Sequence, residues 1–150
     1  MGLEGGVACN ARHVVRSTWA LQATPLQMQI RSYSVDYESA IISLWERCGL
    51  IRPWNDPKKD IARKTKIDPD LLLVGLLGES LIGTIMIGYE GHRGWINYLA
   101  IDPNHRRKGY ARRLMVAAEH LLAERGCPKV NLQVRAGNCE AEAFYEALGY

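Results

Sequence analysis

Three apolar runs joined by very short polar turns constrain the fold more than any other feature of this sequence. The runs cover residues 71–77, 81–89 and 95–101, and the turns between them cover residues 78–80 and 91–94. Each run has the length of a strand and is much too short to span a membrane. Glycine-containing turns of this length join antiparallel neighbours. The sequence therefore predicts an antiparallel meander at the centre of the domain.

Four segments with helical signals surround these strands in the sequence. They cover residues 36–48, 57–66, 109–125 and 140–148. In the third segment, apolar residues recur at i, i+3, i+4 and i+7, which gives the helix one buried face. Asp36, Asp56 and Asn138 are placed to cap the first, second and fourth helices. With short strands at 30–33 and 130–134, the sequence predicts an α/β (α+β) fold, in which a mixed, mostly antiparallel sheet carries helices on both faces.

Composition excludes several classes of protein. Of the 150 residues, 47% are hydrophobic and 23% are charged, which is typical of a globular domain and excludes a chain that is disordered throughout. The four cysteines form no C-x-x-C pair and have no histidine at a metal-ligand spacing, so we expect reduced thiols, no metal and a cytoplasmic location. A net charge of +3 is too small to indicate a nucleic-acid or membrane partner.

Residues 1–27 differ from the rest of the chain. They contain Glu4 as their only acid and show no sustained periodicity, whereas Met28 opens an alternating, strand-like stretch. We predict a disordered or non-native N-terminal extension over 1–27, followed by a single domain over 28–150. Arg12 and Arg16 keep a targeting peptide open as an alternative, although the lack of an apolar core and of an A-x-A site argues against secretion.

Positive charge is concentrated between the third central strand and the long helix. Residues 104–113 contain no acid and five basic residues, namely Arg106, Arg107, Lys108, Arg112 and Arg113. Cations at a helix N-terminus oppose the helix dipole, so this cluster indicates a bound polyanion. Gly109 has no Cβ and lets backbone N–H groups approach a phosphate. The sequence contains neither G-x-G-x-x-G nor a P-loop, so neither of those nucleotide-binding motifs is indicated.

Two motifs carry a family resemblance. The run 99–111 resembles the acyl-coenzyme A signature of the GNAT superfamily of N-acetyltransferases, R/Q-x-x-G-x-G/A, at Arg106, Gly109 and Ala111. The run 138–150 resembles the second motif of the same superfamily and follows in the expected order.

Further similarity extends through the rest of the predicted domain. The segment 44–57 and the turn 88–94 are similar to the bacterial YpeA subgroup, and the whole resemblance covers residues 28–150. Members of the superfamily continue with further strands at the point where this chain ends. The resemblance therefore predicts a GNAT-like domain that is truncated at its C-terminus, with an unpaired edge on the strand at 130–134.

The resemblance implies acetyl-CoA as a co-substrate. It places the pyrophosphate on backbone amides of the basic turn, and the pantetheine arm beside the third central strand with Asn138 on its other side. The residues that it assigns to this site are Leu99, Ala100, Ile101, Arg106, Arg107, Lys108, Gly109, Tyr110, Ala111 and Asn138.

The chemistry of the expected reaction assigns further residues. A thioester can be attacked only by a neutral amine, whereas a free lysine amine has a pKa of about 10.4. The resemblance places Tyr145 beside the sulfur, where a phenol with a pKa of about 10 would protonate the leaving thiolate. Glu90 is the candidate base, directly or through water, and His92 lies in the same turn. Asn97 is expected to position a water molecule or the substrate.

The acceptor side is predicted to involve Arg52, Trp54 and Asn55 together with His92 and Asn97. Trp54 and Arg52 would receive an aromatic or acidic acceptor. The expected function is an acetyl-CoA-dependent N-acetyltransferase that acts on a primary amine, in a small molecule or a protein, by direct attack on the thioester. The alternatives are an idle acyl-CoA-binding module and a nucleic-acid-binding domain, the latter disfavoured by the modest charge. Neither the acceptor's identity nor a homodimer is decided by the sequence.

Overall fold

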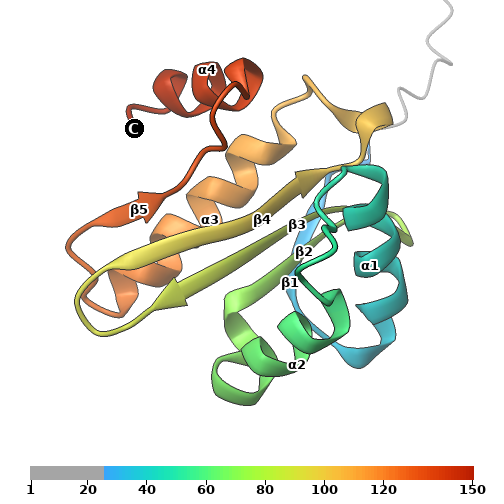
Figure 1. Ribbon diagram of the computed structural model, residues 1–150, viewed down its shortest axis with the longest axis horizontal. Helices are drawn as coiled ribbons and strands as arrows, with labels where there is room; N and C mark the ends of the chain where they lie inside the picture. Colours follow the sequence, from blue (N-terminus) through green and yellow to red (C-terminus); the bar gives the residue numbers. More distant parts are fainter. Residues whose placement is uncertain (1–25) are drawn as a thin grey trace, which may run out of the picture.

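The computed structural model describes residues 26–150 and contains one five-stranded sheet (Figure 1). The strand order is β1-β2-β3-β4-β5, where β1 is Gln29–Ser32, β2 is Leu72–Leu77, β3 is Ser80–Tyr89, β4 is Gly94–Ile101 and β5 is Val130–Leu132. The first four strands are antiparallel neighbours, and β5 runs parallel to β4. The predicted mixed, mostly antiparallel sheet is therefore confirmed. Of the predicted extension over 1–27, residues 1–25 lie outside the described part of the chain.

Within residues 26–150, four α-helices and three short 3-10 helices accompany the sheet. The α-helices are α1 (Glu38–Arg47), α2 (Pro57–Ile67), α3 (Tyr110–Glu124) and α4 (Cys139–Ala147). The 3-10 helices are η1 (Val35–Tyr37), η2 (Pro69–Leu71) and η3 (Pro103–His105). Figure 1 shows α1 and α2 on one face of the sheet and α3 on the other, as the sequence predicted. No helix within residues 26–150 is long and apolar enough to cross a membrane.

Each face of the sheet carries its own apolar core. On the α3 face, the buried positions of the helix pack against strand residues such as Ile85 and Ile96; they are Leu114, Met115, Ala118 and Leu122. On the other face, α1 buries Ile41, Leu44 and Trp45, and α2 buries Ile61. The spacing of these residues is the helical periodicity seen in the sequence.

Two strand glycines let α3 approach the sheet closely. A Cβ at Gly83 would lie 2.9 Å from Cδ1 of Ile101 and 3.0 Å from Cδ1 of Leu114. A Cβ at Gly94 would lie 2.7 Å from Cδ1 of Leu122. These separations are shorter than van der Waals contact, so a larger residue at either position would force the packed Ile101, Leu114 or Leu122 side chain to move.

The helix caps confirm two predictions and correct a third. Asp56 caps α2, where its Oδ1 accepts a hydrogen bond from the backbone N of Lys58 at 3.0 Å, and Asn138 caps α4. Asp36 does not cap α1, because it lies inside η1, where its own N–H donates to Oγ of Ser34 at 3.4 Å. Ser34 therefore caps η1, which directly precedes α1, and α1 itself begins at Glu38.

Candidate active site

β4 carries a bulge beside the candidate site. Thr84 and Met86 of β3 pair with Ala100 and Asn97 of β4, so β4 contains one extra residue in this interval. Tyr98 lies there with φ of 48°, in the left-handed region that non-glycine residues rarely adopt. A bulge of this kind bends the strand and interrupts the ladder of hydrogen bonds.

Contacts from α1, from α2 and from the loop between them hold Tyr98 in this conformation. Its ring stacks on Trp45, with a centroid distance of 3.9 Å. Its hydroxyl donates to Oδ2 of Asp60 at 2.6 Å and accepts from Nδ2 of Asn55 at 2.7 Å. Burial, followed by the bond to Asp60, raises the pKa of Tyr98 to about 12. The hydroxyl is therefore protonated and serves as a fixed link between α2 and β4.

The bulge is also supported from inside the core. Thr84 is the one fully buried polar side chain among residues 26–150. Its hydroxyl donates to the carbonyl of Tyr98 at 3.0 Å and accepts from Nε1 of Trp45 at 2.9 Å. Sequence reasoning did not identify Tyr98 or Thr84 as site residues. In the sequence, the support for the bulge is marked only by Thr84 itself, a threonine within the otherwise apolar run 81–89.

β4 and β5 separate next to this bulge. Their pairing begins at Gly94 with Val130 and ends at Ile96 with Leu132, whereas β4 continues to Ile101. In Figure 1 the chain leaves the sheet after β5 and leads to α4. Within the described residues, Asn97–Ile101 therefore has no strand partner on this side, and we call this stretch the open edge of β4.

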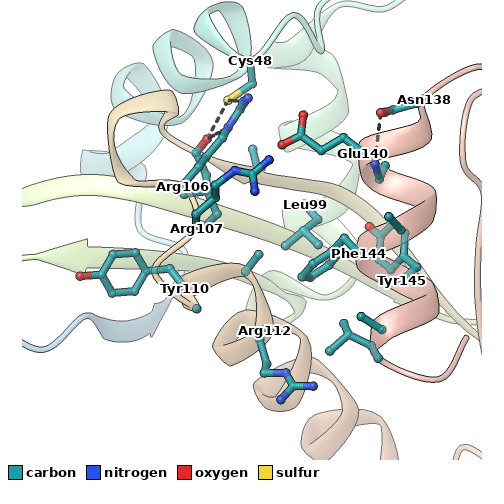
Figure 2. Close-up of a pocket in the computed structure, with 18 of the residues that line it drawn as sticks. Cys48, Leu99, Arg106, Arg107, Tyr110, Arg112, Asn138, Glu140, Phe144 and Tyr145 are labelled. Carbon is teal, nitrogen blue, oxygen red and sulfur yellow. Dashed lines mark hydrogen bonds between the residues drawn. The ribbon is translucent and has the colours of Figure 1, made fainter.

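A cavity of about 980 Å³ lies between the open edge, the start of α3 and α4; we call it the first cavity (Figure 2). Most of the predicted donor-site residues line it, namely Leu99, Ala100, Ile101, Arg106, Arg107, Gly109, Tyr110, Ala111 and Asn138. Lys108 does not line it. Sequence reasoning missed Cys48 and Glu140, which also line the cavity.

The start of α3 has free anion-binding capacity. Gly109 occupies the N-cap position with φ of 81°, and no side chain caps the helix. The first N–H groups of an α-helix have no partner inside the helix. An added Cβ at Gly109 would meet no atom within 4 Å, so the space in front of these groups is open. By contrast, side chains of Asp56 and Asn138 satisfy the equivalent groups of α2 and α4. This donor set fits a phosphate or pyrophosphate group.

Arg106 turns back toward the sheet and leaves the helix start. Its Nε donates to the carbonyl of Ile101 at 3.1 Å, and its Nη2 lies 3.6 Å from Sγ of Cys48 (Figure 2). The thiol of Cys48 donates to the same carbonyl at 3.3 Å. The side chain of Arg106 thus fixes the basic turn to the end of β4, and the Ile101 carbonyl already has two donors.

Tyr145 projects from α4 toward the open edge (Figure 2). It is half-buried, and its ring packs edge-on against Phe144 at a centroid distance of 5.1 Å. Burial raises the pKa of Tyr145 above its usual value, so the phenol keeps its proton at neutral pH. Its hydroxyl makes no hydrogen bond to any residue within 26–150 and is free to donate to a ligand.

A second cavity, of about 570 Å³, lies on the other side of Leu99. It is lined by polar side chains that the first cavity lacks, namely Arg52, Asn97, Tyr98, Gln133 and Arg135. The two cavities share six lining residues, which are Cys48, Leu50, Leu99, Asn138, Ala141 and Tyr145. They therefore meet at the point where the Tyr145 side chain faces the open edge.

The structure brings only some predicted acceptor residues to this junction. Arg52 and Asn97 line the second cavity, whereas Asn55 supports Tyr98 from behind and Trp54 is 81% exposed in a loop.

The predicted base is also away from the junction. Glu90 and His92 lie in the turn between β3 and β4 and line neither cavity. The Glu90 carboxylate instead accepts from the backbone N of Arg93 at 2.6 Å. This turn adjoins the first residue of β4, Gly94, whereas the open edge is at the other end of the strand. Within residues 26–150, no group of three or more His, Cys, Asp or Glu side chains is placed to hold a metal ion.

Comparisons with known proteins define the class of this molecule as an acyltransferase. The chain is 48% identical over 123 residues to an acetyltransferase of Sodalis glossinidius, covering 82% of this chain and 87% of the relative. It is 47% identical over 123 residues to an acetyltransferase of Pectobacterium atrosepticum, with the same shares covered. Residues 37–150 match the model of the acetyltransferase (GNAT) family. The chain belongs to this family, which confirms the resemblance to the GNAT superfamily seen in the sequence.

Solved structures agree with this assignment. The fold is similar to that of Ard1 from Thermoplasma volcanium, with a TM-score of 0.67, 26% identity and 81% of each chain covered. It is also similar to that of the PaiA N-acetyltransferase from Thermoplasma acidophilum, solved in complex with coenzyme A. There the TM-score is 0.68 at 18% identity, with 81% of this chain and 88% of the other covered.

Proposed function

We propose that this protein is an acetyl-CoA-dependent N-acetyltransferase that acts on a primary amine. The observation that carries the proposal is the junction of two cavities at Tyr145, one with an anion-binding helix start and one with a polar lining. A reaction between a phosphate-bearing donor and a separate acceptor needs such an arrangement, because both must reach one point. The coenzyme A complex of the PaiA N-acetyltransferase, which shares the fold, supports the identity of the donor.

The donor would lie in the first cavity. Backbone N–H groups at the start of α3, from Gly109 onward, would bind the pyrophosphate, with positive charge from Arg107 and Lys108 nearby. The open edge of β4 would pair with the amide groups of the pantetheine arm as an added strand would. The main chain of Leu99 is the natural partner for that arm, because the Ile101 carbonyl is already occupied. Asn138, at the N-terminus of α4, lines the opposite wall.

The transfer requires that the attacking amine is neutral and that the leaving sulfur gains a proton. The neutral amine attacks the thioester carbonyl, the C–N bond forms, the C–S bond breaks and the thiolate leaves. Tyr145 would donate its phenolic proton to that sulfur, the nitrogen would lose its extra proton to water, and the tyrosinate would recover a proton from water. Within residues 26–150, no Asp, Glu or His lines the second cavity, so we assign the proton's removal to water near Asn97 and Gln133. The rate should then rise with pH as more of the acceptor amine becomes neutral.

Calorimetry with coenzyme A tests the donor site. Gly109→Asp places a negative charge in the open space at the start of α3 and should abolish measurable binding. Gly126→Asp is the matched control at the other end of the helix. Gly126 has a similar φ of 75°, against 81° at Gly109, and equally open space for a Cβ. If both folded variants bind coenzyme A as the parent does, the donor site is not at the start of α3.

Release of free thiol from acetyl-CoA tests the transfer. We expect release that depends on added amine and that yields one acetylated amine per thiol, as mass spectrometry would show. Binding of coenzyme A without thiol release for any amine would contradict an enzyme and would instead support an idle acyl-CoA-binding module.

A further inference from the structure

The second cavity has a one-sided charge. Two arginines, Arg52 and Arg135, line it together with the neutral residues Asn97, Gln133 and Asn138. No carboxylate within residues 26–150 lines it. Asp60, which bonds the hydroxyl of Tyr98, is absent from the lining, and its carboxylate is already paired with Arg63 at 3.1 Å. The charged residues that line this cavity are therefore all basic.

Arg52 has an unused hydrogen-bond donor. Its Nε is buried and has no partner within the described residues. A buried donor without a partner is unfavourable, so the conformation of this arginine leaves a polar group unsatisfied beside the second cavity. The backbone of Arg52 is fixed, because its N–H donates to Oδ1 of Asn55 at 2.8 Å and Nδ2 of Asn55 bonds Tyr98. The network that supports the bulge therefore also positions this arginine.

We propose that the acceptor is a small primary amine that also carries an anionic group, a carboxylate or a phosphate, bound by Arg52 with help from Arg135. This inference rests on the proposed function and names its substrate class. The guanidinium group presents N–H donors in a fixed plane that matches carboxylate and phosphate oxygens. A volume of about 570 Å³ suits a small molecule. Polyamines should be excluded, because a second positive charge would face two guanidinium groups with no carboxylate to offset it.

Matched pairs of acceptors test the anionic group. In each pair the amine is kept and the anion is removed: β-alanine against β-alaninamide, and phosphoethanolamine against 2-methoxyethylamine, with spermidine as the polycation. We expect kcat/KM to favour the anionic member of at least one pair by about 10- to 100-fold, the range for a charged hydrogen bond. The favoured pair distinguishes carboxylate from phosphate. Equal rates within both pairs, or spermidine as the best acceptor, would overturn the proposal.

Variants of the arginines separate recognition from folding. Arg52→Gln should lower kcat/KM for the favoured anionic amine by about 10- to 100-fold and change that for its neutral partner by no more than about twofold. Arg135→Gln should act in the same direction but more weakly, because Arg135 is exposed. Arg31→Gln, on β1 and outside both cavities, is the control and should change neither rate. Equal losses on both amines would show that Arg52 has a structural role only.

A binding measurement keeps the inference independent of turnover. Protein saturated with coenzyme A would be titrated with N-acetyl-β-alanine, N-acetyl-β-alaninamide and N-acetylphosphoethanolamine. We expect heat of binding from at least one of the two anions and none from the neutral amide. If an anion binds but no amine is turned over, the proposed function is wrong and the anionic site stands. If all three compounds bind equally, or none binds, the anionic site is wrong and the proposed function is unaffected.

Discussion

Helices α3 and α4 both border the first cavity, but they are held in very different ways. α3 has 15 residues and inserts four fully buried side chains into the core, whereas α4 has 9 residues and buries none completely. Phe144, Tyr145 and Leu148 of the α4 segment pack only partly against the same core. The helix that would bind the donor's phosphates is thus a rigid part of the domain, and the one that carries the proposed proton donor is attached lightly.

This difference suggests a division of work between the two walls. A phosphate-binding helix start is useful only if its N–H groups stay in place, which the buried face of α3 ensures. A helix with little buried surface opens more readily, so α4 is the wall that can move when ligands enter or leave. The hydroxyl of Tyr150 ties the end of this segment to α3 by donating to Glu119 at 2.7 Å, whereas the Asn138 cap acts within α4 itself.

The largest expected effect concerns chemistry on α4. Tyr145→Phe removes one half-buried hydroxyl and keeps the ring, so the fold should be retained. If the phenol protonates the leaving thiolate, kcat should fall by roughly 10²- to 10⁴-fold, the usual range for a general acid. The affinity for coenzyme A should hardly change, and calorimetry checks this. An active parent whose Phe variant keeps full turnover would show that Tyr145 only packs.

The next effect compares how much each helix contributes to stability. Leu114 of α3 is 0% exposed, and Leu114→Ala should lower the free energy of unfolding by about 2–5 kcal/mol. Leu148→Ala, at the end of α4, removes a side chain that is only half-buried and should cost about 1 kcal/mol. Urea unfolding measures both values. Equal losses would mean that α4 is anchored as firmly as α3.

A smaller effect is local to α4. Asn138→Ala removes the side chain that accepts from the backbone N of Ala141 at 3.2 Å and should destabilise the helix by about 1 kcal/mol. Amide hydrogen exchange should accelerate about fivefold in α4, with α3 unchanged. Asp56→Ala, at the start of α2, is the matched control and should affect α2 only. Faster exchange in α3 would show that the two helices open as one unit.

The smallest effect depends on pH. Burial, followed by the bond to Glu119, raises the pKa of Tyr150 above its usual value. Because the folded pKa is raised, the bond stabilises the protein fully below the unfolded pKa of about 10 and is lost as pH rises through the folded pKa. Tyr150 is 40% exposed, so Tyr150→Phe should cost only about 0.5 kcal/mol. The difference in Tm between parent and variant should be constant near neutral pH and disappear at strongly alkaline pH; a constant difference throughout would contradict this.

Local patterns explain what the sequence predicted well. The meander and α3 follow from periodicity in continuous segments, and the start of α3 follows from one continuous basic motif. The bulge at Tyr98 could not be found in this way, because the Trp45 and Asp60 side chains that hold it come from other parts of the chain. Similarly, the sequence shows that Glu90 lies in a turn but not which end of β4 borders the cavities. That outcome is decided by strand register and by where β5 separates from β4.

The close approach of α3 to the sheet at Gly83 and Gly94 has a consequence for how this protein tolerates inherited change. Because the start of α3 would bind phosphates through its backbone, many exchanges among the basic side chains around it should leave a working site. The packing beneath that backbone depends on two positions that line neither cavity. Mutational drift should therefore be freer at the mouth of the first cavity than at these glycines beneath α3, where an added methyl group would crowd the buried side chains of that helix.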